Sequence, residues 1–409
     1  MKPRAFLAAV GDVNDPVTWS GIPYHFLQSA RIAGLLDEGL PLSTGDFGWK
    51  ALRLGWNLSR VLSGDRYGGY QYSTAFLERL WSTVLPRLKS NLVVNCFQLY
   101  APIVVRDHTI EKWFFIDQTL LQLFDYYEQR ATVGRRIALE AIEREREGYN
   151  AAAGVIVHSR WAAESVMRDY LISPDRVHVV LPGANVDQDE YARWEIEEER
   201  RRATLSDEER PLRLVFVGKY WHRKGLDRLL HAIALARRDG LRATLRVIGC
   251  ERDSLPDGLR DVEGVEWLGF IDKRTQAVRF FRAVSECDVG CLLSRVEAGG
   301  IALREYHALG LISLGADTGG APEHMIAGAS VTVPTGANDE EIANTLLNLE
   351  RDPSRLNNLR MAAWEKRRSA LWDESVRQIL SFWPHARTGS EAPFNLTADF
   401  SPQYDEVRC

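Results

Sequence analysis

The 409-residue chain is longer than one compact core usually allows, so its length predicts two domains of ordinary size. A hydrophobic fraction of 45% and a charged fraction of 26% are typical of a folded globular enzyme and exclude a disordered or fibrous chain. The net charge of -5 excludes broad nucleic-acid binding, which needs a basic excess, but leaves room for a small basic pocket.

The first residues, Met1 to Val10, carry two basic side chains and then a short apolar run. This run is too short to span a membrane and lacks the features of a cleaved signal peptide, and no other stretch reaches the length of a membrane helix. The five cysteines are scattered, without the paired spacing of a zinc site. We therefore expect a cytoplasmic protein with reduced thiols and no bound metal.

Residues 1–190, which we assign to an N-terminal domain, alternate short apolar runs with segments of helical periodicity. This alternation is typical of a parallel α/β sheet. Ser159 is placed to cap a helix over Arg160–Tyr170. The expected strands are Ala5–Val10, Leu92–Phe97, Trp113–Ile116, Gly154–His158 and Val177–Leu181.

Two segments of this half have an unusual composition. Phe47–Lys89 is rich in Trp, Tyr, Arg and Leu, and Asp125–Glu147 mixes Arg and Glu on a long helical pattern. One interpretation is helices packed on the sheet with charged outer faces. The other is a surface that binds the acceptor or a membrane, because basic amphipathic helices settle on anionic lipid headgroups.

The composition then changes at Asp187–Asp207, a dense run of acidic residues and arginines with little apolar content. It predicts a solvated helix and a linker, which we place at 191–210. A surface for a partner protein is the alternative interpretation.

A second α/β pattern follows, assigned to a C-terminal domain of residues 211–368. We expect an amphipathic helix at Leu371–Phe382, within a segment 369–385, and a loose polar tail at 386–409. The expected strands are Leu212–Val217, Ala243–Ile248, Val265–Trp267, Val289–Leu293 and Ile312–Gly315, and the expected helices are Gly225–Ala236, Gly300–Leu309, Asn338–Asn348 and Pro353–Arg367.

Two lysines follow the first strand of this second pattern. Gly218 and Lys219 come directly after the strand, and Lys224 precedes Gly225 and a helix. The carboxyl end of a parallel strand is where open α/β sheets bind ligands. The loop therefore indicates a site for an anion, although Gly-Lys alone also occurs in ordinary surface loops.

Two glycines follow a later strand and open a helix. Gly299 and Gly300 leave room for a phosphate, and the first helical N–H groups would then point toward it. Glu297 and Glu305 would repel a phosphate, so hydroxyl groups of a sugar or ribose are their natural partners. A phosphate flanked by hydroxyl-bearing rings is a nucleotide sugar.

A third loop, Asp317-Thr318-Gly319-Gly320-Ala321-Pro322-Glu323, turns at the same sheet edge. Together the order of Gly-Lys and Lys-Gly, then Glu-x7-Glu, then Gly-Gly-x-Pro-Glu resembles the family 4 glycosyltransferases, which are retaining enzymes. The resemblance implies the GT-B architecture: two Rossmann-like α/β domains with a cleft between them, and a C-terminal helix that crosses back to the N-terminal domain. Trp19-Ser20-Gly21 also resembles that family's donor-facing loop.

The resemblance also implies residue roles. Two positions depart from the family pattern: Lys219 stands where Arg is more frequent, and Asp117 stands where the family often has His. The implied catalytic residues are Lys219, Lys224, Glu297 and Asp117. The implied nucleotide-sugar-binding residues are Gly21, Gly218, Phe270, Ile271, Gly299, Gly300, Ile301 and Glu305.

The expected function is the transfer of a sugar, with retention and without a metal or cofactor, from a UDP- or GDP-sugar to a glycan, a lipid-linked acceptor or a small molecule. Expected partners are therefore the donor and the acceptor, with no nucleic acid, and peripheral contact of the N-terminal domain with the inner membrane face stays open. The alternatives are a nucleotide-sugar-binding scaffold and another GT-B enzyme such as an epimerase.

Overall fold

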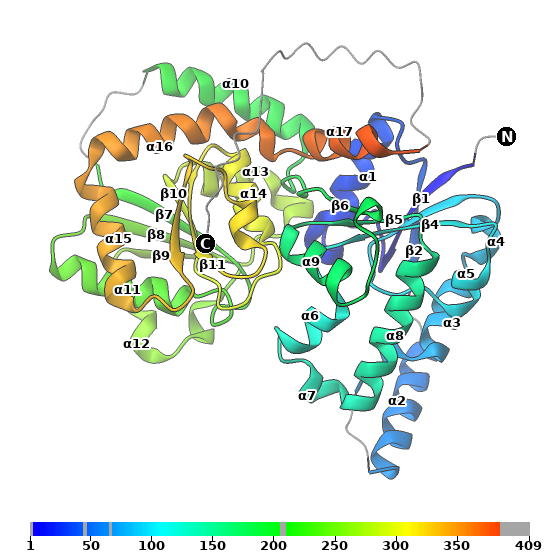
Figure 1. Cartoon of the computed structure of the whole chain (residues 1–409). Helices are drawn as coiled ribbons and strands as arrows, with labels where there is room; N and C mark the ends of the chain where they lie inside the picture. The colour runs from blue at the N-terminus through cyan, green and yellow to red at the C-terminus, as the bar shows by residue number, and fades with distance from the viewer. Residues whose placement is uncertain (1–2, 44–46, 65–67, 205–209, 385–409) are drawn as a thin grey trace, which may run out of the picture.

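The computed structural model describes residues 3–43, 47–64, 68–204 and 210–384 and contains two parallel six-stranded sheets (Figure 1). The N-terminal sheet has the strand order β2-β1-β3-β4-β5-β6. Its strands are β1 Ala5–Val10, β2 Glu38–Leu42, β3 Leu92–Asn95, β4 Glu111–Ile116, β5 Gly154–Val157 and β6 Val177–Val179.

The C-terminal sheet has the order β12-β11-β10-β7-β8-β9, in which the first strand of this half lies in the middle. Its strands are β7 Leu212–Val217, β8 Ala243–Ile248, β9 Val265–Gly269, β10 Val289–Leu292, β11 Ile312–Asp317 and β12 Ser330–Pro334. The fold class expected from the sequence is confirmed, because both halves are parallel α/β sheets of Rossmann type.

Helices connect the strands in both halves. In the N-terminal half they are α1 Ile22–Ile32, α2 Phe47–Leu62, α3 Thr74–Ser82, α4 Leu85–Leu88, α5 Pro102–Arg106, α6 Leu120–Asp125, α7 Arg130–Val133, α8 Arg135–Ala151 and α9 Arg160–Arg168. Those that follow are α10 Gln188–Thr204, α11 Leu226–Arg238, α12 Asp257–Arg260, α13 Lys273–Ser285, α14 Ile301–Ala308, α15 Asp339–Arg351, α16 Pro353–Lys366 and α17 Trp372–Phe382.

Two strands were not expected from the sequence, and both lie at an edge of a sheet. In β2 the sequence Glu-Gly-Leu-Pro-Leu contains Gly39 and Pro41, which weaken the strand pattern. Proline is tolerated on an edge strand because one side of the strand needs no N–H donor. In β12 buried and exposed residues alternate, and the short run resembles a loop when read alone.

The charged stretch after residue 187 is helical, as expected, but it is not fully solvated. Tyr191 and Trp194 of α10 pack into an apolar cluster of the C-terminal half. Glu195 is buried and contacts Arg367 and Arg368 at 2.8 and 2.7 Å. Glu195 of α10 therefore binds the turn that follows α16. Local composition does not reveal this pairing.

Helix α17 returns to the N-terminal half, as the sequence predicted, and Figure 1 shows it beside α1. Trp372 stacks on Phe26, with ring centroids 5.5 Å apart, and Ser375 donates a hydrogen bond to the carbonyl of Leu181. Helix α17, which follows the C-terminal half in the sequence, thus packs on the N-terminal half and joins the two. The expected tail, 386–409, lies outside the described residues.

Across the described ranges, no helix is long and apolar enough to cross a membrane.

Candidate functional site

The order of the C-terminal sheet creates a crevice at its centre. Strand β7 lies between β8 and β10, and the chain leaves β7 toward β8 on one side and later returns to β10 on the other. At such a switch point the loops after the two strands diverge, and ligands bind between them. The loops that diverge here are 218–225 after β7 and 293–300 after β10, which carry Lys219, Lys224 and Glu297.

The two loops are in backbone contact. The N–H of Arg295 donates to the carbonyl of Arg223 at 2.8 Å. Gly225 has φ +73°, and a Cβ added there would lie 2.0 Å from the carbonyl oxygen of Leu293. Glycine is required at this position for both reasons. The close approach fixes Lys224 next to the second loop.

Glu297 is the centre of a charged cluster. Its Oε2 lies 3.4 Å from Nζ of Lys224 and 3.2 Å from Nη1 of Arg223, and it accepts a hydrogen bond from Ser294 at 3.0 Å. Burial opposes ionisation of this carboxyl group, but the two cations outweigh burial and hold its pKa below the usual value. The predicted pair of Lys224 and Glu297 is thus brought together, and Arg223 is an additional cation that the sequence motif did not indicate.

Helix α14 begins beside this cluster. Gly300 precedes it with φ +78°, and a Cβ at Gly299 would lie 2.8 Å from Cε1 of His324. The chain therefore carries no side chain at residues 299 and 300, and the ring of His324 packs against the backbone just before the first turn of the helix. Such a helix start binds anions.

The residues predicted to contact the base and the ribose lie along the next part of the sheet edge. Lys219 is exposed, and its Nζ lies 4.5 Å from the centre of the Phe270 ring. Ile271 is buried. Glu305 is also buried, and its carboxylate forms an ion pair with Lys273. Lys273 stands far from Glu305 in the sequence, so no local pattern indicated it.

The N-terminal half contributes the loop after β1. Gly21 has φ +92°, and the preceding Ser20 also has a positive φ. Asn185 donates to the carbonyl of Ser20 at 2.7 Å and accepts from the indole N–H of Trp372 at 3.1 Å. The end of the N-terminal half and helix α17 therefore hold the loop in place.

Asp117 follows β4 and is half-buried. Burial raises the pKa of its carboxyl group to about 7, and repulsion by Glu297 acts in the same direction. Hydrogen bonds from the backbone N–H groups of Asp117 and Gln118 act in the opposite direction. Asp117 of the N-terminal half is therefore close enough to Glu297 for the two carboxyl groups to repel each other.

Tyrosines 126 and 127 cross the same gap. The hydroxyl oxygen of Tyr127 accepts a hydrogen bond from the N–H of Ala298 at 2.8 Å, and the guanidinium of Arg223 lies 5.8 Å from its ring centre. The hydroxyl of Tyr126 contacts that of Thr318. Burial, followed by repulsion from Glu297 and Asp117, raises the pKa of Tyr127. Neither tyrosine was expected from the sequence.

The third glycine loop, after β11, binds the N-terminal half directly. The carboxylate of Glu323 accepts hydrogen bonds from the N–H groups of Arg160, at 2.7 and 2.8 Å, and of Trp161, at 3.2 Å. These are the first N–H groups of α9, which lack partners within the helix. Nε2 of His324 lies 3.0 Å from the carbonyl oxygen of His158. The halves therefore meet in a closed arrangement around the site.

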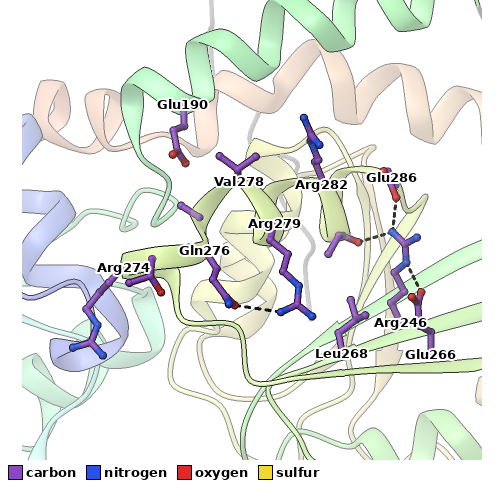
Figure 2. Close-up of a pocket in the computed structure, with 13 residues that line it drawn as sticks. Glu190, Arg246, Glu266, Leu268, Arg274, Gln276, Val278, Arg279, Arg282 and Glu286 are labelled. Atoms are coloured by element: carbon purple, nitrogen blue, oxygen red, sulfur yellow. Dashed lines mark hydrogen bonds and ion pairs between the residues drawn. The ribbon is translucent and has the colours of Figure 1, made fainter.

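A separate hollow of about 640 Å³ lies between α13 and strands β8 and β9, and Figure 2 shows the charged side chains that line it. Some of these side chains pair within the hollow: Arg246 contacts Glu266 at 2.8 Å and Glu286 at 2.7 Å, and Arg279 contacts Gln276 at 3.3 Å. None of the predicted site residues lines this hollow. In the part of the chain that the structure describes, no three His, Cys, Asp or Glu side chains gather as metal ligands.

Residues 196–366 match the model of the family Glycosyl transferases group 1. This part, somewhat less than half of the chain, is therefore similar to that family. The matched segment contains β7, β10 and β11 and therefore the three glycine loops around Glu297.

Curated relatives agree with this assignment. A D-inositol 3-phosphate glycosyltransferase from Corynebacterium glutamicum is 29% identical over 241 residues, which are 56% of this chain and 56% of that protein. Another from Thermomonospora curvata is 27% identical over 265 residues, 60% of this chain and 58% of that protein. The chain thus matches a little more than half the length of these relatives.

Solved structures resemble the whole fold. Sucrose-phosphate synthase from Thermosynechococcus elongatus aligns with a TM-score of 0.61 at 14% identity, covering 92% of this chain and 97% of that one. HepE from Anabaena, in complex with UDP and glucose, aligns with a TM-score of 0.59 at 15% identity, covering 93% and 100%. These likenesses show that the fold of the chain is GT-B.

Proposed function

We propose that the chain transfers a sugar from a nucleoside-diphosphate sugar to an acceptor hydroxyl, with retention of the anomeric configuration. The observation that carries the proposal is the convergence, at the switch point of the C-terminal sheet, of Lys224, Arg223 and the start of α14 around Glu297. Cations and helix N–H groups match a diphosphate, and the carboxylate matches sugar hydroxyls.

The barrier in this reaction is dominated by breaking the bond between the anomeric carbon and the diphosphate. Negative charge grows on the leaving oxygen, and fixed cations beside it lower the barrier. Lys224 and Lys219 would stabilise that charge, and Glu297 would hold the transferred sugar. For retention, the acceptor attacks from the face that the diphosphate leaves, and the leaving phosphate takes the acceptor's proton. No step of this route requires a metal or a cofactor.

The donor site is expected to take UDP or GDP. Backbone groups at Phe270 and Ile271 would meet the base, and one carboxylate oxygen of Glu305 would accept from ribose hydroxyls while Lys273 occupies the other. The UDP-bound state of the HepE structures supports a nucleoside-diphosphate donor.

The acceptor is assigned to the N-terminal half, on the side of Asp117 and Tyr127. It is a glycan, a lipid-linked acceptor or a small molecule, and the D-inositol 3-phosphate glycosyltransferases among the relatives add weight to a small polyol phosphate. Peripheral membrane contact through the N-terminal half and a cytoplasmic location belong to the same proposal.

The proposal is tested by calorimetric titration of UDP and GDP into wild type and Lys224→Met. Methionine keeps the stem that packs on Gly218 and removes the charge. Loss of one charge-assisted contact should weaken binding of the preferred nucleotide by about ten- to a hundredfold. Lys366→Met, on the outer end of α16, is the control and should bind like wild type.

Turnover separates transfer from the alternatives. A transferase releases free nucleoside diphosphate when an acceptor is present, an epimerase yields an altered donor without acceptor, and a scaffold binds the donor without converting it. The anomeric proton of the first-formed product, followed by NMR, reports the stereochemistry. An inverted product would overturn the retaining mechanism, and equal nucleotide binding by Lys224→Met would overturn the site.

A further inference from the structure

Helix α2 exposes a stripe of large apolar side chains. Leu54 is 70% exposed, Leu58 58%, Val61 56% and Leu62 78%. Their spacing of four, three and one residues places them on one face of the helix. Isolated exposed apolar residues, such as Ile32 and Leu171, occur elsewhere and need no explanation, but four on one helix face do.

The opposite face of α2, toward the protein, combines tryptophans that pack on the apolar core with two buried polar side chains. Asn57 and Arg60 are each only 4% exposed. The amide oxygen of Asn57 accepts from the N–H of Gly68 at 3.2 Å, and Nη2 of Arg60 donates to the carbonyl of Val133 at 3.0 Å. A surface helix normally buries its apolar stripe and exposes its polar one. Helix α2 already buries an apolar face through Trp49 and Trp56, so the exposed leucines form a second apolar stripe beyond the one that the fold uses.

The charges around the stripe indicate which medium. The 16 residues of α2 include Lys50, Arg53 and Arg60 and no acidic residue. Arg135 and Arg136 are exposed at the start of α8, which the contact between Arg60 and Val133 holds beside the end of α2. A second copy of this chain would bring like charges to the same stripe. An anionic lipid surface supplies both the apolar interior and the opposite charge.

We propose that α2 lies in the surface of an anionic bilayer, with Leu54, Leu58, Val61 and Leu62 among the acyl chains and Lys50 and Arg53 at lipid phosphates. Figure 1 shows α2 running along the outside of the N-terminal half to its tip, beside α8 and away from the C-terminal sheet. The N-terminal half thereby docks on the membrane through an element that carries none of the predicted site residues. The inference gives the membrane contact of the proposed function a definite element, but it does not depend on the donor assignment.

The test is flotation of the full chain with vesicles of phosphatidylcholine, with and without phosphatidylglycerol. Wild type should bind the phosphatidylglycerol vesicles and release them at high salt. The affinity of the triple variant Leu54→Ser/Leu58→Ser/Leu62→Ser for these vesicles should be lower by about tenfold or more. Lys50→Glu/Arg53→Glu, which leaves the leucines in place, should lose the preference for the anionic vesicles.

The matched control is Ile32→Ser/Leu171→Ser, which removes equally exposed apolar side chains elsewhere and should bind vesicles like wild type. Equal vesicle binding by wild type and the triple variant would overturn the proposal. Equal binding of wild type to neutral and to anionic vesicles would also overturn it. Sedimentation of the chain without lipid tests the rival occupant: a dimer that the triple variant dissociates would assign the stripe to a second copy. Nucleotide titration of the same variants keeps this result separate from the donor site.

Discussion

The carboxyl group of Asp117 combines a position across the cleft from Glu297 with a pKa near neutrality. Burial raises that pKa to about 7, and Glu297 adds to the effect. The charge of Asp117 therefore changes in the physiological range, where a group acting on the acceptor has most influence.

We expect kcat/KM to rise with pH on a limb centred near pH 7, as Asp117 ionises. Asp117→Asn should remove this limb and lower kcat/KM by about ten- to a hundredfold, because the ionised carboxylate would hold the acceptor hydroxyl by a charge-assisted hydrogen bond. Because the folded pKa is raised above the unfolded value, ionised Asp117 costs stability as pH rises. Asp117→Asn should therefore unfold at equal or higher denaturant concentration at pH 8, and a limb retained in this variant would assign it to another group.

Sequence reasoning reached the residues whose neighbours are local. Lys224 and Glu297 could be predicted because each stands at a fixed place after a strand, and parallel strands deliver their ends to one edge. Tyr127 could not, because its hydroxyl meets the N–H of Ala298, 171 residues away. Lys273 was missed for the same reason: its ion pair with Glu305 depends on how α13 and α14 lie together.

At the scale of elements, the contact between the loops after β7 and β10 holds the site. Gly225→Ala would place a methyl group 2.0 Å from the carbonyl of Leu293 at φ +73°, so the start of α11 must move. We expect a loss of about 2–5 kcal/mol in the free energy of unfolding, from the left-handed backbone and the clash together. Urea unfolding measures it.

The matched control is Gly240→Ala. Gly240 has φ +94°, but nothing lies within 4 Å of an added Cβ, so only the backbone term remains. The difference between the two variants isolates the cost of parting the loops. Nucleotide binding should weaken in Gly225→Ala alone. Equal effects of both substitutions on stability and binding would show that the loop contact is unimportant.

Elements with a strong internal pattern were predictable, and those defined by their partners were not. The bounds of β1, β7 and β8 agree with the sequence because apolar residues dominate each of these short runs. Strand β2 contains a glycine and a proline, and it forms because β1 supplies its hydrogen bonds. Helix α10 was expected as a solvated segment because composition counts its acidic residues and cannot show the arginines that bind them.

At the scale of the whole molecule, the two halves are joined by groups that need a particular protonation state. Glu323 caps α9 as a charged acceptor, where a carboxylate also meets the positive end of the helix. His324 contacts the carbonyl of His158 through Nε2, while its Nδ1 is buried without a hydrogen-bond partner. If low pH protonated the imidazole at Nδ1, the new N–H group would therefore be buried without a hydrogen-bond acceptor.

Acid should open this arrangement. Burial, followed by repulsion from Arg304, lowers the pKa of His324 to about 3, and burial, followed by Lys273, lowers that of His25 to about 3. Each imidazole is neutral in the folded chain and takes up its proton on unfolding, so its stabilising contribution is present above pH 6.5 and is lost as pH falls toward 3. At pH 5 the loss amounts to about 2 kcal/mol per histidine.

Urea unfolding of wild type at pH 7.5 and pH 5 should show this fall, and His324→Gln should reduce it by about 2 kcal/mol, because glutamine binds no proton. Tyr126→Phe removes a hydrogen bond of the same interface and no imidazole, so its cost should be equal at both pH values. If His324→Gln and wild type lost the same stability between the two pH values, His324 would not be the group that acid charges. The acid sensitivity of the folded chain would then rest on the other imidazoles whose pKa is lowered by burial, namely His25, His158 and His307.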